Sequence, residues 1–139
     1  MRVVCERIFN PDATPAFSET IEAHPRIAVG EEYVVSFIRI EPGRTPGPTY
    51  PGVFFALVRD ERHFSHGMWP YEMFRSTSTR IPSNWVAEID EDGYLAIAPA
   101  AFLEPFFWER VQGDSGTREE RLAAIADYKR ELEVIFAEA

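Results

Sequence analysis

The residues best suited to metal chemistry lie in one short segment, where Asp60 and Glu61 are followed by His63 and His66. Imidazole and carboxylate groups are ordinary zinc ligands, and a zinc site usually takes three or four of them. The two histidines are three residues apart in a segment of loop character, without the i, i+4 spacing of helical zinc motifs, and no cysteine joins them. The segment therefore favours a solvated loop, and we expect neither a metal nor a cofactor.

A serine or cysteine nucleophile needs an activating base and a recognisable local setting. Ser76 and Ser78 lie in a serine-threonine run that is typical of a strand edge, and no Gly-x-Ser-x-Gly motif occurs. Cys5 lies in an apolar run, so we expect a buried, unreactive thiol. We therefore expect no enzyme. Two of the many carboxylates could still converge in a pocket, which keeps a small enzyme as an alternative.

Two further segments resemble a calcium loop and a phosphate-binding loop, but each lacks a feature that the loop requires. Asp90, Glu91 and Asp92 are consecutive acids, but a calcium loop needs alternating oxygen ligands over about twelve residues, and the apolar run that follows breaks that pattern. The glycines of segment 42–52 are flanked by prolines, which lack the N–H donors that cradle a phosphate. We therefore expect a charged hairpin tip at the three acids, which could meet a basic partner.

Charge is the most informative property of the chain. Its 139 residues carry 23 acids and 14 bases, a formal net charge of −9. Residues 85–139 hold thirteen of the acids and five of the bases, so −8 of that charge lies in this segment. Because like charges repel, the excess argues against nucleic acid or an anionic membrane as partner and favours a basic protein.

Aromatic residues are interleaved with these acids, and an acidic surface with aromatic anchors suits the binding of a basic protein. The acids of the last predicted helix have a local explanation, because they cap or solvate that helix. Phe106, Phe107 and Trp108 are consecutive on a short helix, so they cannot all face one core. The candidate partner-binding residues are Trp69, Tyr71, Glu88, Asp90, Glu91, Asp92, Glu104, Trp108, Glu109 and Asp114.

These features predict a small acidic protein that binds and neutralises a basic protein, in the way that bacterial immunity proteins block toxins. The comparison is one of class and rests on no shared motif. An alternative is a small adaptor or ligand-binding module, built on a little barrel, that uses the 42–52 loop with Trp69 and Tyr71 as its groove. The oligomeric state is not determined by the sequence.

The cysteine content and the first residues indicate where the protein works. A single cysteine excludes an internal disulfide and fits a reducing compartment. The chain begins without the apolar core of a signal peptide, and no apolar stretch approaches the length of about 20 residues that spans a bilayer. Thirteen of the fourteen bases are arginine, a bias typical of GC-rich codon usage. We therefore expect a bacterial, cytoplasmic protein.

Hydrophobic periodicity predicts the elements that position these residues. At this length we expect one domain over residues 1–139. Strands are predicted at 2–9, 33–40, 53–59, 71–79, 85–90 and 94–98, the last two joined as a hairpin through Gly93. Strands followed by helices are typical of an α+β fold. We expect an antiparallel sheet of about five strands, or alternatively a small curled SH3-like barrel, with short helices and one longer amphipathic helix at the C-terminus.

The last helix is the most strongly specified element. Thr117 and Glu120 have the spacing of a capping box, in which each side chain binds a backbone amide of the other residue. Apolar residues follow at helical spacing, namely Leu122, Ile125, Tyr128, Leu132 and Ile135. This stripe predicts one buried face. Upstream, Pro99 opens a short helix and Pro105 interrupts it.

Overall fold

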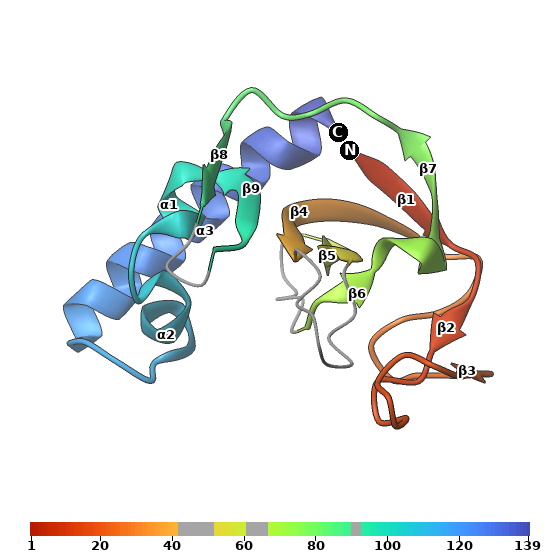
Figure 1. Cartoon of the computed structure of the whole chain (residues 1–139). Helices are drawn as coiled ribbons and strands as arrows, with labels where there is room; N and C mark the ends of the chain where they lie inside the picture. Colours follow the sequence, from red (N-terminus) through yellow and green to blue (C-terminus); the bar gives the residue numbers. More distant parts are fainter. Residues whose placement is uncertain (42–51, 61–66, 90–92) are drawn as a thin grey trace.

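A computed structural model of the chain describes residues 1–41, 52–60, 67–89 and 93–139. The fold is α+β, as predicted: a large antiparallel sheet is followed by three helices, of which the last is the longest (Figure 1). Within the described residues the sheet has seven strands rather than about five, and it is not closed. The barrel alternative is therefore wrong. One unpredicted strand has only two residues, which is too short to show any periodicity.

The strands of the main sheet are β1 (Arg2–Cys5), β4 (Glu32–Glu41), β5 (Gly52–Val58), β6 (Trp69–Pro70), β7 (Phe74–Ser78), β8 (Trp85–Ile89) and β9 (Leu95–Pro99). A separate pair consists of β2 (Ile8–Phe9) and β3 (Thr20–Ile21), and a 3₁₀ turn, η1 (Tyr71–Met73), precedes β7. The helices are α1 (Ala100–Leu103), α2 (Phe107–Gln112) and α3 (Arg118–Glu138). The predicted hairpin at 85–98 is confirmed, whereas the strand predicted over 71–79 begins only after the 3₁₀ turn.

β4 organises the sheet because it is long enough to pair with two strands in succession along one edge. Its first half pairs with β1 and its second half with β9, while β5 runs along its other edge. The order is β6-β5-β4-β1-β7, and β8 pairs with β9. In Figure 1 the sheet therefore divides into two arms, one of β1 and β7 and one of β9 and β8.

A bulge in β4 decides which side chains enter which core. Val35 lies opposite Leu57 and Phe37 lies opposite Ala56, so Ser36 is an extra residue in β4. Simple alternation would put Phe37 on the face of Val35, but the extra residue moves it to the opposite face, where it packs with the helices. The buried Ser36 hydroxyl donates to the Ala56 carbonyl at 3.3 Å.

The sheet separates two hydrophobic cores, one on each face. The first, here named the strand core, consists of Val3, Cys5, Ile8, Ile27, Tyr33, Val35, Phe55, Leu57, Trp69 and Met73. The second, named the helical core, consists of Val34, Val58, Ala98, Phe102, Phe107, Val111, Ala124, Tyr128, Leu132 and Ile135. Because successive β4 residues enter different cores, this strand is apolar on both faces.

The buried face of α3 differs from the predicted stripe at its first turn. Tyr128, Leu132 and Ile135 are buried as predicted. Leu122 is exposed, and Ala124 is buried in its place. A position four residues before Tyr128 shares its face of the helix, whereas a position six residues before is rotated by about 120° from it. The larger apolar residue therefore points to solvent.

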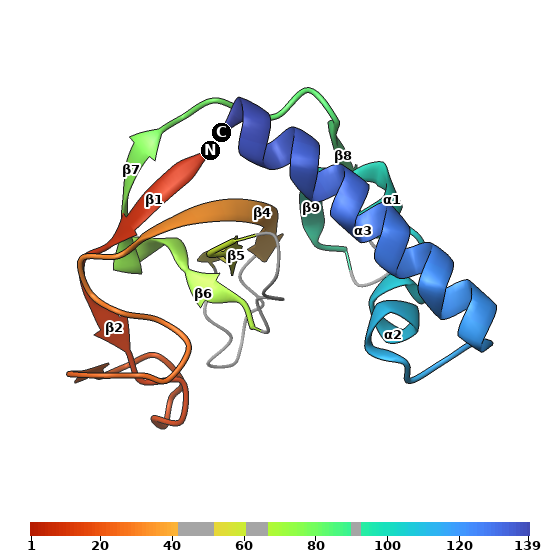
Figure 2. The same ribbon diagram turned by 180° about the vertical axis from the view of Figure 1, so that it is seen from behind.

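Contacts at both ends fix α3 on the sheet. The capping box is confirmed, since the Glu120 amide donates to Thr117 Oγ1 at 3.2 Å and the Thr117 amide donates to Glu120 Oε2 at 2.6 Å. Near the other end, the amide and the hydroxyl of Ser83 donate to the two carboxylate oxygens of Glu138 at 2.6 and 2.8 Å. Figures 1 and 2 both show the two chain termini side by side, at this end of α3.

Candidate partner-binding surface

The predicted binding residues divide between the two sides of the molecule. Trp69 and Tyr71 belong to β6 and η1, on the side of the strand core (Figure 1). Those on the side that carries the helices are Glu88, Glu104, Trp108, Glu109 and Asp114. The predictions that lie outside the described residues are Asp90, Glu91, Asp92, His63, His66 and segment 42–51. The structure therefore does not gather the predicted set into one surface.

Trp69 packs in the strand core. It is 5% exposed, its ring meets the His24 ring edge-on at 4.9 Å, and its backbone pairs with that of Phe55. Tyr71 is 46% exposed and packs edge to face on Phe55 at 6.5 Å. Of the two residues, Tyr71 alone presents much of its ring to solvent. Because the sequence indicated a loop here, it gave no sign that Trp69 belongs to a strand.

A pocket of about 330 Å³ lies beside Trp69, and its lining includes Phe17, His24 and Arg26. The Arg26 amide donates to His24 Nδ1 at 3.1 Å, so this ring nitrogen acts as an acceptor. Phe17 has a left-handed backbone with φ 62° and packs against Phe54 at 6.2 Å. The ligand-binding alternative placed its groove at the 42–52 loop, and this pocket shares only Trp69 with that prediction.

Trp108 belongs to an aromatic cluster in the helical core. Its ring centroid lies 5.2 Å from that of Phe102, 5.3 Å from Phe107 and 5.9 Å from Tyr128. Such ring pairs contribute about 0.5–1.5 kcal/mol each beyond the area they bury. Burial in this cluster also raises the pKa of Tyr128 to about 12. The contacts of Trp108 are therefore packing contacts within the helical core, and a role for it in binding stays a prediction.

Phe106 is the exposed aromatic residue next to that cluster. It is 67% exposed and adopts a left-handed conformation with φ 60°, directly before α2. A bulky residue in this conformation costs about 1–3 kcal/mol. The turn sends Phe107 into the helical core and leaves Phe106 in solvent. The sequence indicated that the aromatic residues of this segment diverge, but not which one is exposed.

Carboxylates lie on both sides of Phe106 in the sequence. Residues 104–114, which run from the C-cap of α1 to just beyond α2, are here named the α1–α2 elbow. Glu104 pairs with Arg110 at 3.4 Å. Glu109 and Asp114 are exposed and make no ion pair with any residue that the structure describes. Backbone hydrogen bonds hold the elbow together, because the Phe107 amide donates to the Glu104 carbonyl and the Asp114 amide to that of Glu109, at 3.1 and 2.8 Å. The elbow thus combines one exposed ring with exposed negative charge.

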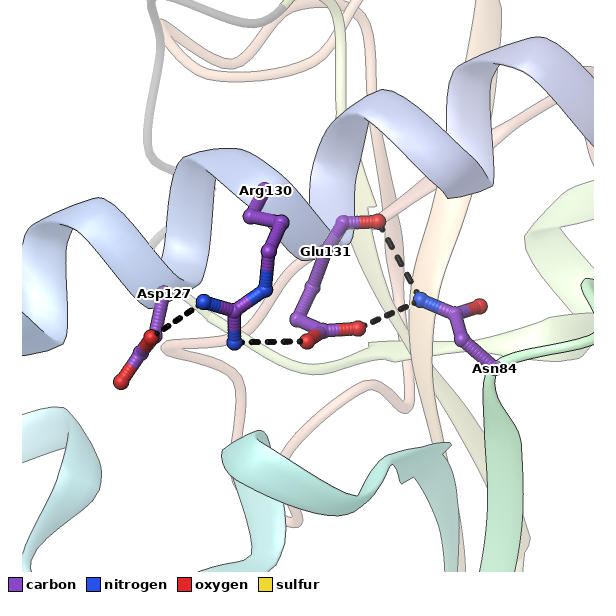
Figure 3. A network of polar contacts seen from close by, with 4 residues as sticks. All are labelled: Asn84, Asp127, Arg130 and Glu131. Atoms are coloured by element: carbon purple, nitrogen blue, oxygen red, sulfur yellow. Dashed lines mark hydrogen bonds and ion pairs between the residues drawn. The ribbon is translucent and has the colours of Figure 1, made fainter.

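Other acids hold α3 against the start of β8 (Figure 3). Asn84 Nδ2 donates to the Glu131 carbonyl at 3.3 Å and to its Oε2 at 2.8 Å. Arg130 joins Asp127 and Glu131 at 2.7 and 3.2 Å. Donation from Ser83 lowers the pKa of Glu138 in the same region. These acids were expected to solvate or cap the helix, and the contacts show instead that Glu131 and Glu138 attach it to the segment before β8.

Two observations concern the metal-ligating and nucleophilic side chains of the described residues. No three of their His, Cys, Asp or Glu side chains lie close enough together to hold a metal ion. Cys5 is buried, and burial raises the pKa of its thiol, which disfavours the nucleophilic thiolate. In the same part of the chain, no helix has both the length and the apolar character to cross a membrane.

Comparison with known proteins finds no match: no protein-family model, no curated protein and no solved structure is similar enough to this chain to be matched. The comparison with immunity proteins therefore stays a prediction from the sequence. Within the described residues, the elbow joins an exposed aromatic ring to a left-handed backbone at Phe106.

Proposed function

We propose that the protein binds a basic protein partner through the α1–α2 elbow and thereby blocks that partner, as immunity proteins block toxins. The observation that carries the proposal is Phe106, an exposed aromatic residue held in a strained backbone conformation between exposed carboxylates. Strained residues are concentrated at functional sites, and aromatic side chains supply much of the energy of protein interfaces.

The charge of the elbow supports a basic partner. Glu120, Glu131 and Glu138 have partners within the chain that explain their positions. The side chains of Glu109 and Asp114 have none within the described residues, so their charge is available to a second molecule. Complementary charge raises association rates by steering the encounter, and an exposed ring then supplies contact area.

We infer that the partner's activity is blocked because a basic partner would use its positively charged side chains to bind its own substrate. A protein that acts on nucleic acid binds phosphates through lysine and arginine side chains. An acidic protein competes for those same side chains. Binding at the elbow would thus exclude the partner's substrate without any catalysis by this chain.

The test compares two variants with matched changes. The elbow variant carries Phe106→Ala, Glu109→Gln and Asp114→Asn. The control variant carries Tyr71→Ala, Glu19→Gln and Glu22→Gln, which also removes one exposed ring and two exposed carboxylates. Each is immobilised, exposed to an extract of the source cells and cross-linked, and the captured proteins are identified by mass spectrometry.

We expect the unchanged protein and the control variant to capture the same basic protein and the elbow variant to lose it. With that protein purified, the association rate constant should fall about tenfold or more between low and moderate salt, because salt screens exposed charges. Capture of an acidic protein, or equal capture by the elbow variant, would refute the proposal.

A second candidate function is small-ligand binding in the pocket beside Trp69. Its volume of about 330 Å³ lies within the range of ligand pockets, and aromatic rings line it. Ligand-observed NMR with a fragment library tests this candidate. Fragments that bind the elbow variant normally but lose binding to Phe17→Ala would support it, and a library without hits would exclude it.

A further inference from the structure

The described sheet has edges at β6, β7 and β8, and two of these are protected. β6 is only two residues long, is buried and ends in Pro70. β7 exposes Arg75, Ser76 and Thr77, and Arg75 pairs with Glu6 at 2.9 Å. Short strands, prolines and charged side chains are the usual means by which proteins prevent another strand from joining a sheet.

Among the described residues β8 has one charged side chain, Glu88, and otherwise lacks this protection. Its five residues pair with β9 in regular register, with no bulge that would twist the edge away. Val86 is 38% exposed and Ile89 is 75% exposed, while Ala87 and Glu88 between them are also exposed. A regular and largely apolar edge of this kind is a template for strand addition.

The contacts of Trp85 show which backbone groups of β8 point away from β9. Trp85 lies opposite Pro99, which has no N–H, and its own amide donates to the Pro82 carbonyl at 3.2 Å, so this pair exchanges no hydrogen bond. Bonded and non-bonded pairs alternate along an antiparallel ladder. Ala87 and Ile89, two and four residues further on, therefore direct their N–H and C=O groups outward.

We propose that an extended, basic segment of the partner adds to β8 as a further strand. This inference rests on the proposed function, because α1 contacts both β8 and α2 and thus connects this edge with the α1–α2 elbow. Basic and apolar side chains would alternate along the added strand, since Glu88 favours a basic neighbour and Ile89 on the opposite face favours an apolar one. A second copy of the chain is a poor occupant, because two molecules of net charge −9 repel each other.

The test uses a seven-residue peptide of alternating valine and lysine with blocked ends, and a matched peptide with glutamate in place of lysine. Ala87→Pro removes an outward N–H, while the bonds of Val86 and Glu88 to β9 are kept, because proline is tolerated where an edge N–H faces solvent. Ala87→Thr is the control that keeps the N–H. Binding is measured by titration, and hydrogen exchange of the Ala87 and Ile89 amides is followed by NMR in the unchanged protein.

We expect the lysine peptide to slow exchange at both amides and the glutamate peptide not to bind. Ala87→Pro should weaken binding of the lysine peptide about tenfold, and Ala87→Thr less than threefold, as expected for loss of one strand-to-strand hydrogen bond and its neighbours. The exchange measurement in the unchanged protein decides the question even if Ala87→Pro fails to fold.

Three outcomes would overturn strand addition: no binding, binding without slower exchange at these two amides, and protection caused by self-association in the absence of peptide. None of them bears on the capture experiment with the elbow variant. Failure of this inference is therefore distinguishable from failure of the proposed function.

Discussion

The strand core and the helical core lie on opposite faces of one sheet, but they are assembled from different ranges of sequence. The strand core combines residues between Val3 and Met73, which are brought together by strand pairing. Apart from Val34 and Val58, the helical core comes from the continuous segment between Ala98 and Ile135. Helices that bury one face leave the other to solvent. Residues 85–139, which include this segment, carry −8 of the net charge of −9. Residues 85–139 therefore both supply most of the helical core and carry most of the net charge.

Deletion of one large side chain from each core tests whether the two cores unfold together. Phe102→Ala should lower the free energy of unfolding by about 3–5 kcal/mol, and Met73→Ala by about 2–5 kcal/mol, because both side chains are fully buried. Urea unfolding is followed by tryptophan fluorescence and by far-ultraviolet circular dichroism. Coincident transitions in every variant would support the predicted single domain. Separate transitions would show that the strand core and the helical core unfold independently, which would contradict a single domain.

Asn84 tests the attachment of α3 to the sheet. Asn84→Ala removes both hydrogen bonds to Glu131 and should cost about 1–3 kcal/mol, because one acceptor is a largely buried carboxylate. Thr77→Ala is the counterpart on the other side, since it removes one exposed hydrogen bond to Glu32, and should cost less than about 1 kcal/mol. If both variants lose the same free energy of unfolding in chemical denaturation, the network in Figure 3 stabilises the protein no more than an exposed hydrogen bond does.

Thr117 tests the local stability of α3. Thr117→Ala removes the hydroxyl that accepts from the Glu120 amide and should cost about 1 kcal/mol. Thr117→Ser keeps an equivalent cap and should restore most of that loss. The measurement is the midpoint of thermal unfolding, and an alanine variant as stable as the unchanged protein would contradict the expectation.

The dependence of stability on acid pH, through Glu138 and Glu32, is the smallest of the expected effects. Donation from the Ser83 amide and hydroxyl lowers the pKa of Glu138 from its ordinary 4.5, and bonds from Thr77 and Arg2 lower that of Glu32. A lowered folded-state pKa means that the carboxylate stabilises the fold above pH 4.5, and this stabilisation is lost as the pH falls through the folded-state value. Glu138→Gln should therefore make stability less dependent on pH below 4.5. Glu138→Gln and Glu32→Gln are compared by urea unfolding at several pH values, and an unchanged slope would show that the bond has no effect.

Prediction from the sequence succeeded where a short segment carries its own signal. The capping box of Thr117 and Glu120 and the hairpin at 85–98, joined through Gly93, needed only neighbouring residues, and both elements are present. The α+β class followed from the order of strands and helices. For the candidate surface, the sequence did not show which side chains are exposed. Glu109 and Asp114 are exposed, whereas Trp69 is buried by partners distant in sequence, and a binding role for any of them stays a prediction.

The sequence by itself determined the uneven charge, the position of α3 and the alternation of apolar residues, because each of these depends on composition or on spacing within one element. Only the tertiary structure decided that Ser36 is a bulge that moves Phe37 to the helical face. It also decided that Phe106, rather than Trp108, presents its ring to solvent. Both outcomes depend on strand register and on competition for space in a shared core, and these arise only when distant segments pack against one another.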